Sequence, residues 1–280
     1  MTPVRLISLG GVLVLATACS LEKTFTEPSV PMAGIHFLNA VPDTMQLDFR
    51  VVDIPSNAGF FDANFRSGNM FYTPIEAGAR DVRVFLSSSD PTISSHVMVD
   101  TTFTFTENAN YTFILAGMSR AGQTPARATW VVPDNAAAPP VGQIGLRVIH
   151  AGSSMGNFDL RVTRHSADTL PDTPLVGNVA YGTVGSYVTI PFDSLATDTA
   201  RIVVTAAGVK TNVFFTLKLP TGVAGTTINN PIAGARVPGS AMTAVVVPPS
   251  VVGSAAPQGG AFLTPTAVIF VDRRPPDTAP

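Results

Sequence analysis

The chain carries one stretch twice: Phe37–Ala40 (FLNA) followed by Leu47–Val51 (LDFRV), and Val148–Ala151 (VIHA) followed by Phe158–Val162 (FDLRV). The spacing between the two parts is the same in both copies. In LDFRV and FDLRV, apolar residues alternate with Asp and Arg, so one face of a strand can enter a core while the other stays in water. The repeated stretch therefore predicts a β-strand in each of two copies of one unit.

The agreement between the copies continues along the chain. Late in each copy, Thr129–Asp134 parallels Ala267–Asp272, and two aromatic residues six positions apart lie between the matching ends. These aromatic residues are Phe65 and Phe71 in the first copy and Tyr181 and Tyr187 in the second. A period this long predicts tandem domains, because the repeats of a solenoid run to about 20–50 residues.

Composition favours strands over helices and a globular chain over a disordered one. Hydrophobic residues make up 45% of the 280 residues and charged residues 13%, while 23 Gly and 24 Pro interrupt the chain too often for long helices. Short alternating runs at Val82–Val84, Phe103–Phe105 and Tyr111–Phe113 are typical of strands. We expect the polar segment Glu107–Asn110 to join the last two runs as a hairpin. The fold class is therefore all-β, with antiparallel β-sandwiches.

The N-terminus predicts export. Arg5 precedes an apolar run, Leu6–Leu15, that is too short to span a bilayer, and small residues lead up to Cys19. Cys19 is the single cysteine of the chain, which excludes an intramolecular disulfide. The run Ala16–Cys19 resembles the bacterial lipobox, which implies removal of residues 1–18 as a signal peptide and acylation of Cys19. Ser20 resembles the sorting signal of lipoproteins released to an outer membrane.

The domain boundaries follow from these patterns. We expect a flexible tether over residues 19–33, a first sandwich over 34–134, a linker over 135–143, a second sandwich over 144–273 and a loose tail over 274–280. Residues 221–240 are rich in Gly, lack a counterpart in the first copy and are expected to form a surface loop. The sequence leaves open whether the two sandwiches touch.

A family resemblance adds to this reading. The second unit contains Arg147–Ala151, then Phe158–Leu160, then Val179–Val184 and Tyr187. This pattern resembles the DUF4397 family of extracytoplasmic bacterial domains, and the second unit resembles the family more closely than the first. The resemblance implies an immunoglobulin-like β-sandwich, often in tandem and often on a surface lipoprotein. It implies no reaction and no catalytic residues, because the function of the family is undefined.

A search for catalytic or metal-binding patterns is largely negative. The four histidines lack the paired spacings that place two imidazoles on one metal, so we expect no metal site and no cofactor. His150 lies near Asp159 in the repeated motif, but a hydrogen-bonded structural histidine is favoured over a catalytic base. Asp48 with Arg50, and Asp159 with Arg161, are expected on a solvated strand face, as surface or edge pairs rather than an active site. The histidines are His36, His96, His150 and His165.

Other polar and aromatic groups give weaker signals. Two acidic groups could be considered for calcium: Asp168 with Asp172, and the segment 193–198 with an Asp at each end. Neither group has the closely spaced oxygen ligands of a calcium-binding loop. Gly152–Gly156 has the wrong spacing for a nucleophile elbow and is expected to be a turn. Phe60–Phe61 is expected to cover the end of a sandwich, the alternative being an exposed contact for a polymer or a protein.

These patterns favour a non-enzymatic protein attached to the cell envelope by the lipid at Cys19. Its tandem sandwiches would act as spacer or adhesive binding modules, with an extracellular protein or a polysaccharide as candidate partners. The formal charge of -2 gives no reason to expect a nucleic-acid partner. Two alternatives stay open: an extracytoplasmic hydrolase with an unrecognised site, and a structural component of an envelope assembly.

Overall fold

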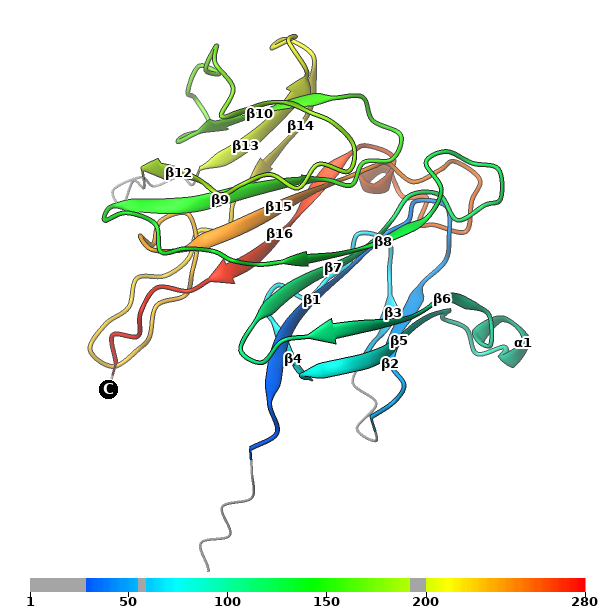
Figure 1. The fold of residues 1–280 in the computed structure, drawn as a ribbon. Helices are drawn as coiled ribbons and strands as arrows, with labels where there is room; N and C mark the ends of the chain where they lie inside the picture. The colour runs from blue at the N-terminus through cyan, green and yellow to red at the C-terminus, as the bar shows by residue number, and fades with distance from the viewer. Residues whose placement is uncertain (1–28, 55–58, 192–199, 280) are drawn as a thin grey trace, which may run out of the picture. The chain divides into compact units, whose positions relative to one another are not determined.

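The computed structural model describes residues 29–54, 59–191 and 200–279, and nearly all of its regular structure is β-strand (Figure 1). The helical segments in these ranges are short: α1 (Pro91–Ser94) and the 3-10 helix η1 (Gly260–Phe262). α1 begins where the Asp90 carboxylate accepts a hydrogen bond from the backbone N–H of Thr92 at 2.9 Å. Within these ranges, none of the helices has the length and apolar character needed to cross a membrane.

Each half of the chain forms two four-stranded sheets. In the first half their orders are β4 (Thr73–Glu76), β1 (Met32–Ala40), β7 (Asn110–Ala116), β8 (Ala128–Pro133), and β3 (Gly59–Ala63), β2 (Leu47–Val51), β5 (Gly78–Leu86), β6 (Val97–Phe105). In the second half they are β12 (Val188–Pro191), β9 (Gln143–His150), β15 (Ala241–Val247), β16 (Thr266–Arg273), and β11 (Val176–Val179), β10 (Phe158–Thr163), β13 (Arg201–Ala206), β14 (Val213–Lys218). Each strand of the first half therefore has a counterpart in the second, and the predicted all-β class with two sandwiches is confirmed.

The pairing of strands differs from expectation in two places. One pair in each sandwich is parallel, β1 with β7 and β9 with β15, although we expected antiparallel sheets. The predicted hairpin at Glu107–Asn110 is wrong, because β6 and β7 belong to different sheets and the segment crosses from one sheet to the other. A turn sequence specifies a change of direction locally, but it does not specify which sheet the next strand joins.

Each sandwich has its own hydrophobic core, and a third cluster lies between the sandwiches. In β1, Ile35 and Phe37 point into the core of the first sandwich, whereas Leu38 and Ala40 point the other way. This follows from the period of two in a strand, and it leaves both faces of β1 buried. We call the third cluster the seam; its buried residues are Leu38, Ala40, Ile114, Ala116, Val132, Ile149, Ala151, Val245, Val247 and Phe270. The two sandwiches therefore touch, through sheet faces that are as apolar as a core.

Two segments expected at the surface are partly built into the fold. Within residues 221–240, Ala233 and Ala235 are 2% and 4% exposed and pack in the core of the second sandwich. Gly222 has a φ of +75°, and a Cβ there would lie 2.7 Å from the Ile232 carbonyl oxygen, so the close approach of these backbones requires glycine. The tail is also attached, because the Thr278 hydroxyl donates to the Thr226 carbonyl at 2.8 Å. The predictions of a surface loop and a loose tail were wrong on these points.

Candidate functional site

His150 is a structural histidine, as its sequence context favoured. Its Nδ1 accepts a hydrogen bond from the Gly152 backbone N–H at 3.1 Å, and its Nε2 lies 3.3 Å from the Gly156 carbonyl. Burial lowers the pKa of His150 below its usual value, so the ring is neutral at neutral pH. Its counterpart Asn39 also accepts a hydrogen bond from the backbone N–H two residues later, that of Val41. Both side chains therefore hold the chain where it leaves the strand.

The prediction of a solvated face was wrong for Asp48, Asp159 and Arg161, whereas the side chain of Arg50 is 33% exposed. Asp159 and Arg161 are 4% and 3% exposed, and Asp48 is 6% exposed. Asp159 accepts hydrogen bonds from the backbone N–H groups of Asn178 at 2.8 Å and Gly208 at 3.0 Å, and from Arg161 at 3.2 Å. Loops fold over this outer strand face, which the alternation of residues along one strand does not reveal.

The pKa of Asp159 reflects this setting. Burial acts to raise its pKa, but the backbone hydrogen bonds from Asn178 and Gly208, together with Arg161, outweigh burial and lower it. Asp159 is thus an ionised carboxylate that fastens strand β11 at Asn178 and the turn at Gly208. Asp48 makes contacts of the same kind, since it accepts from the Asp62 backbone N–H at 2.9 Å and pairs with Arg50 at 2.5 Å.

The remaining predicted candidates have local roles where the structure describes them. Asp168 accepts from the backbone N–H of His165 at 2.8 Å, and Asp172 pairs with Lys210. Phe60 packs inward, with its ring centre 5.6 Å from that of Phe37, as expected for a residue that covers the end of a sandwich. Phe61 is 51% exposed, as in the alternative of an exposed contact. Gly152–Gly156 forms a turn, as expected. Cys19 and the segment 193–198 lie outside the described residues.

A buried polar cluster, not anticipated from the sequence, lies beside the seam. It consists of four residues from each sandwich, which are counterparts of one another by strand register. They are His36 with Arg147, Thr112 with Thr243, Asp134 with Asp272, and Tyr72 with Tyr187. Tyr187 therefore corresponds to Tyr72, and the sequence match with Phe71 was one residue out of register. We call this set the interdomain cluster.

Hydrogen bonds within the interdomain cluster cross between the sandwiches. Arg147 forms an ion pair with Asp134, and their side chains are 4% and 0% exposed. Asp134 also accepts from Thr112 at 2.7 Å and from Tyr72 at 2.9 Å. Arg147 donates to Thr243 at 2.8 Å and its guanidinium lies 4.7 Å from the centre of the Tyr187 ring. The cluster therefore ties the end of one sandwich to the first strand of the next.

Four groups of the interdomain cluster have strongly shifted pKa values, and burial raises those of Tyr72 and Tyr187. Burial lowers the pKa of His36 to about 4, and burial together with nearby Asp134 raises the pKa of Asp272 to about 7. The His36 Nε2 atom lies 3.9 Å from Asp272 Oδ1. Both groups are therefore largely uncharged in mildly acidic solution, and the ion pair of Arg147 with Asp134 is the main charge pair of the cluster.

The interdomain cluster also contains a group with metal-ligand chemistry. Among the described residues, His36, Asp134 and Asp272 each offer one ligand atom within 4.8 Å of the others. The donor set does not fit a bound cation well, because Asp134 already accepts from Arg147, Thr112 and Tyr72. A divalent cation there would lie next to a guanidinium that already neutralises this carboxylate. The cluster is therefore an ion-paired network that holds the two sandwiches together.

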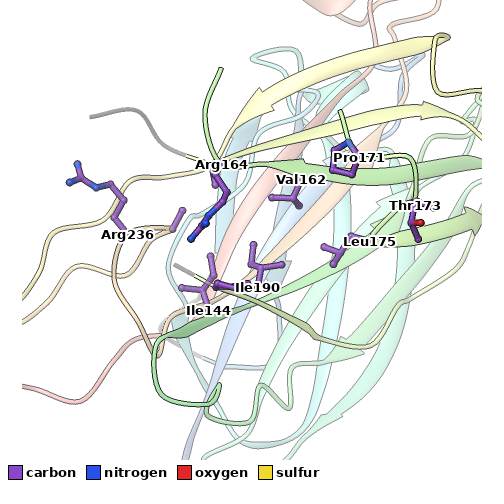
Figure 2. A pocket seen from close by; sticks show the side chains of 12 residues that line it. Ile144, Val162, Arg164, Pro171, Thr173, Leu175, Ile190 and Arg236 are labelled. Carbon is purple, nitrogen blue, oxygen red and sulfur yellow. The ribbon is translucent and has the colours of Figure 1, made fainter. Parts of the chain in front are cut away.

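A cavity of about 360 Å³ opens into the second sandwich. Its lining is mostly apolar and includes Ile144, Val162, Leu175 and Ile190, contributed by both sheets and by the loop before β11 (Figure 2). In Figure 2, Arg164 and Arg236 lie at the end of the cavity opposite Thr173. Arg236 comes from the inserted segment 221–240. An apolar lining with a few charged groups at one end is typical of small-molecule pockets, whose volumes run from about 300 to 1,000 Å³.

Part of the chain matches a known family. Residues 33–161 match the family model DUF4397, described as a domain of unknown function. This part of the chain belongs to DUF4397. The DUF4397 match covers the whole first sandwich and ends in β10, so it does not follow our expectation that the second unit resembles the family more closely. A search of the curated proteins found no significant match.

Signals for the missed residues were present but weak. Asp134 and Asp272 end matching stretches, and Arg147 and His36 precede the repeated motif at equal positions. Each residue alone looks like a solvated polar group at a strand end. Their burial depends on one sandwich covering the other, and the sequence of a single strand contains no information about that contact.

Proposed function

We propose that this chain is a non-enzymatic, lipid-anchored protein of the cell envelope whose folded part is a binding module. The anchor rests on the N-terminal pattern, in which a short apolar run and small residues precede the single cysteine, Cys19. More than one acyl chain on this cysteine would give stable attachment, because each buried methylene contributes about 0.8 kcal/mol. The partner is then met outside the cytoplasm, at the envelope.

The observation that carries the binding role is the cavity in the second sandwich. It is large enough for a small molecule, and its lining joins apolar side chains from Ile144, Val162 and Leu175 to two arginines. A purely structural spacer gains nothing from such a cavity, since an unfilled apolar space costs packing energy. The seam supports the same role, because packing against the first sandwich keeps the second sandwich, and therefore its cavity, in a fixed orientation.

The two alternatives have less support. A hydrolase built on His150 and Asp159 would need these side chains to reach each other and a serine, but His150 contacts the backbone of Gly152 and Gly156, and Asp159 binds Arg161 and two backbone N–H groups. An assembly component would need a large apolar face for its partner. The apolar outer faces of β1 and β9 are instead used in the seam.

Metabolic labelling tests the anchor and protease treatment tests its location. Cells that express the full chain are fed radiolabelled palmitate, with Cys19→Ala as the matched control and Ser20→Ala as a neighbouring substitution that leaves the acceptor sulfur in place. We expect label in the wild type and in Ser20→Ala, and none in Cys19→Ala. Degradation of the protein by protease added to whole cells would place it on the surface. A wild-type protein without label would refute the lipid anchor.

A further inference from the structure

A second cavity, with a volume of about 720 Å³, is lined by residues of both sandwiches. The first sandwich contributes Phe71–Tyr72 and Asn110, at the starts of β4 and β7. The second contributes Pro231–Ala233 from the inserted segment, and Val271–Asp277 from the end of β16 and the tail. We call this cavity the interdomain cleft. It shares no lining residue with the cavity of the second sandwich.

Hydrogen bonds fix the wall of the interdomain cleft that the second sandwich supplies. Val223 and Ile232 exchange two backbone hydrogen bonds of 2.9 Å, which close the inserted segment into a loop. The Asn230 side chain accepts from the backbone N–H groups of Thr278 at 3.0 Å and Ala279 at 2.9 Å, so the tail runs beside this loop (Figure 1). A wall that is already formed lowers the entropic cost of binding a ligand.

Two arginines give the interdomain cleft its charge. Within the described residues, the side chains of Arg273 and Arg274 form neither an ion pair nor a hydrogen bond. Two acids also line the cleft. Asp272 accepts from the Thr243 hydroxyl at 2.6 Å within the interdomain cluster, and burial raises its pKa to about 7, so it is largely uncharged in mildly acidic solution. Asp277 is then the main negative charge of the lining, and the balance is positive.

Apolar rings lie beside these charges. Phe71 is 49% exposed, and Pro275 and Pro276 line the same cleft. Such rings are rigid, and their flat apolar faces suit a sugar ring, whose C–H groups can pack on them while its hydroxyl groups stay in water. A peptide cannot add to β16 at Val271, because the Val271 backbone N–H already donates to the Met70 carbonyl at 3.1 Å.

We propose that the interdomain cleft binds a short segment of an acidic polysaccharide whose sugar rings carry carboxylates. The carboxylates would face Arg273 and Arg274, because planar guanidinium groups match carboxylates well, and a sugar ring would pack on Phe71. The volume of about 720 Å³ lies within the range of about 300–1,000 Å³ for small-molecule sites, so the site takes a short segment of the chain. This inference rests on the proposed role as a binding module and names a partner class for it.

Calorimetric titration of the full chain with trigalacturonate tests the ligand class. The protein is purified from membranes and held in nanodiscs of zwitterionic lipid at about pH 6, where Asp272 is largely uncharged, and empty nanodiscs supply the blank. We expect trigalacturonate to bind. Its fully methyl-esterified form keeps the sugar rings and loses the charges, and it should bind at least about tenfold more weakly.

Triglutamate separates an acidic sugar from an acidic peptide. It offers carboxylates without sugar rings, so it should also bind at least about tenfold more weakly than trigalacturonate. Affinity of either control ligand equal to that of trigalacturonate would overturn the proposal, and so would the absence of trigalacturonate binding.

Four variants locate the binding in the interdomain cleft. Arg274→Gln should weaken trigalacturonate about tenfold or more and leave the methyl ester unchanged, whereas Arg274→Lys should retain more of the affinity because the charge is kept. Phe71→Ala should weaken both ligands alike, by up to about tenfold. Arg120→Gln is the matched control, because Arg120 is an exposed arginine beyond the opposite end of β7 from Asn110, and it should change neither affinity. Circular dichroism melting confirms that each variant is folded. If Arg274→Gln is folded and binds trigalacturonate like the wild type, the proposed site is wrong.

The two proposals can fail separately. If palmitate labels Cys19 but trigalacturonate does not bind, the ligand class fails and the anchored envelope protein stands. If trigalacturonate binds in the interdomain cleft but Cys19 carries no label, the ligand site stands and the anchor fails; the titration then needs no nanodisc.

Discussion

Replacing Arg147 by methionine should destabilise the folded chain by about 3–5 kcal/mol, the usual cost of removing one partner from a buried ion pair. Arg147 pairs with Asp134 and donates to Thr243 at 2.8 Å, and the side chains of the ion pair are 4% and 0% exposed. Methionine keeps the length of the apolar stem, so the loss comes from charge and hydrogen bonds rather than from a large cavity. Among the described residues, the Asp134 carboxylate would keep Thr112 and Tyr72 as side-chain donors.

The loss in Arg147→Met should also depend on pH in a known direction. A buried carboxylate without its cation has a raised pKa, because burial disfavours the charged form. Asp134 in the variant can then neutralise itself by binding a proton, so the folded state gains protons relative to the unfolded state as pH falls. The destabilisation should therefore be largest at neutral pH and smaller near pH 5. Arg147→Met combined with Asp134→Leu should recover most of the lost stability.

Urea unfolding followed by the fluorescence of Trp130 measures this loss. Trp130 is the single tryptophan, packs against the seam and lies 5.4 Å from Tyr181 across it, so it reports on the contact between the sandwiches. Arg83→Met is the matched control, because the pair of Arg83 with Asp100 has side chains 42% and 58% exposed and should contribute about 0–1 kcal/mol. If Arg147→Met is no less stable than Arg83→Met, the interdomain cluster does not hold the sandwiches together.

Three further predictions concern the interdomain cluster, the covered strand face and the seam. In the unfolded chain His36 and Asp272 have their ordinary pKa values of 6.5 and 3.8. Between pH 4 and 6.5 the folded state therefore binds one proton fewer on His36 and one proton more on Asp272 than the unfolded state does. The two effects on the pH dependence of stability cancel. In His36→Gln, stability should therefore fall as pH rises from about 4 to 7, by up to about 1.4 kcal/mol per pH unit. In Asp272→Asn, stability should instead rise between about pH 4 and 6.5, by up to the same amount per pH unit. Urea midpoints that change with pH in the same direction in both variants would contradict this. Asp159→Asn should cost about 1–3 kcal/mol and increase amide hydrogen exchange at Asn178 and Gly208, whose N–H groups donate to the carboxylate. Unchanged exchange there would show that the carboxylate does not hold β11 and the turn at Gly208 in place. Ile149→Ala in the seam should cost about 2–5 kcal/mol in urea unfolding, and a loss below about 1 kcal/mol would mean that the seam is not packed like a core.

The sequence predicted what depends on local alternation. Leu47–Val51 and Phe158–Val162 lie within strands, Asp134 and Asp272 occupy counterpart positions, and the two sandwiches have the same strand order. A period of two is a property of one strand and its neighbours, so it survives in the sequence. The role of His150 was predicted for the same reason, because its partners Gly152 and Gly156 lie a few residues away.

The errors arose where a second layer covers a residue. Asp159 and Arg161 have the alternation of a solvated face, but the segments that carry Pro171 and Gly208 cover them. Leu38 and Ala40 belong to the seam only because β9 and β15 lie opposite. The cavity is lined by Ile144, Val162 and Ile190, which lie far apart in the sequence. Such features are set by contacts between distant segments, which one sequence does not encode in any local pattern.

Comparing two probes of one urea titration of the wild-type chain tests most directly whether the two sandwiches are one folded unit. Trp130 fluorescence reports on the seam, and far-ultraviolet circular dichroism reports on the strands of both sandwiches. Because the seam is buried and the ion pair of Arg147 with Asp134 crosses it, the two probes should give one coincident transition with the same midpoint and the same slope. A fluorescence change that is complete before most of the β signal is lost would show that the sandwiches separate and unfold independently.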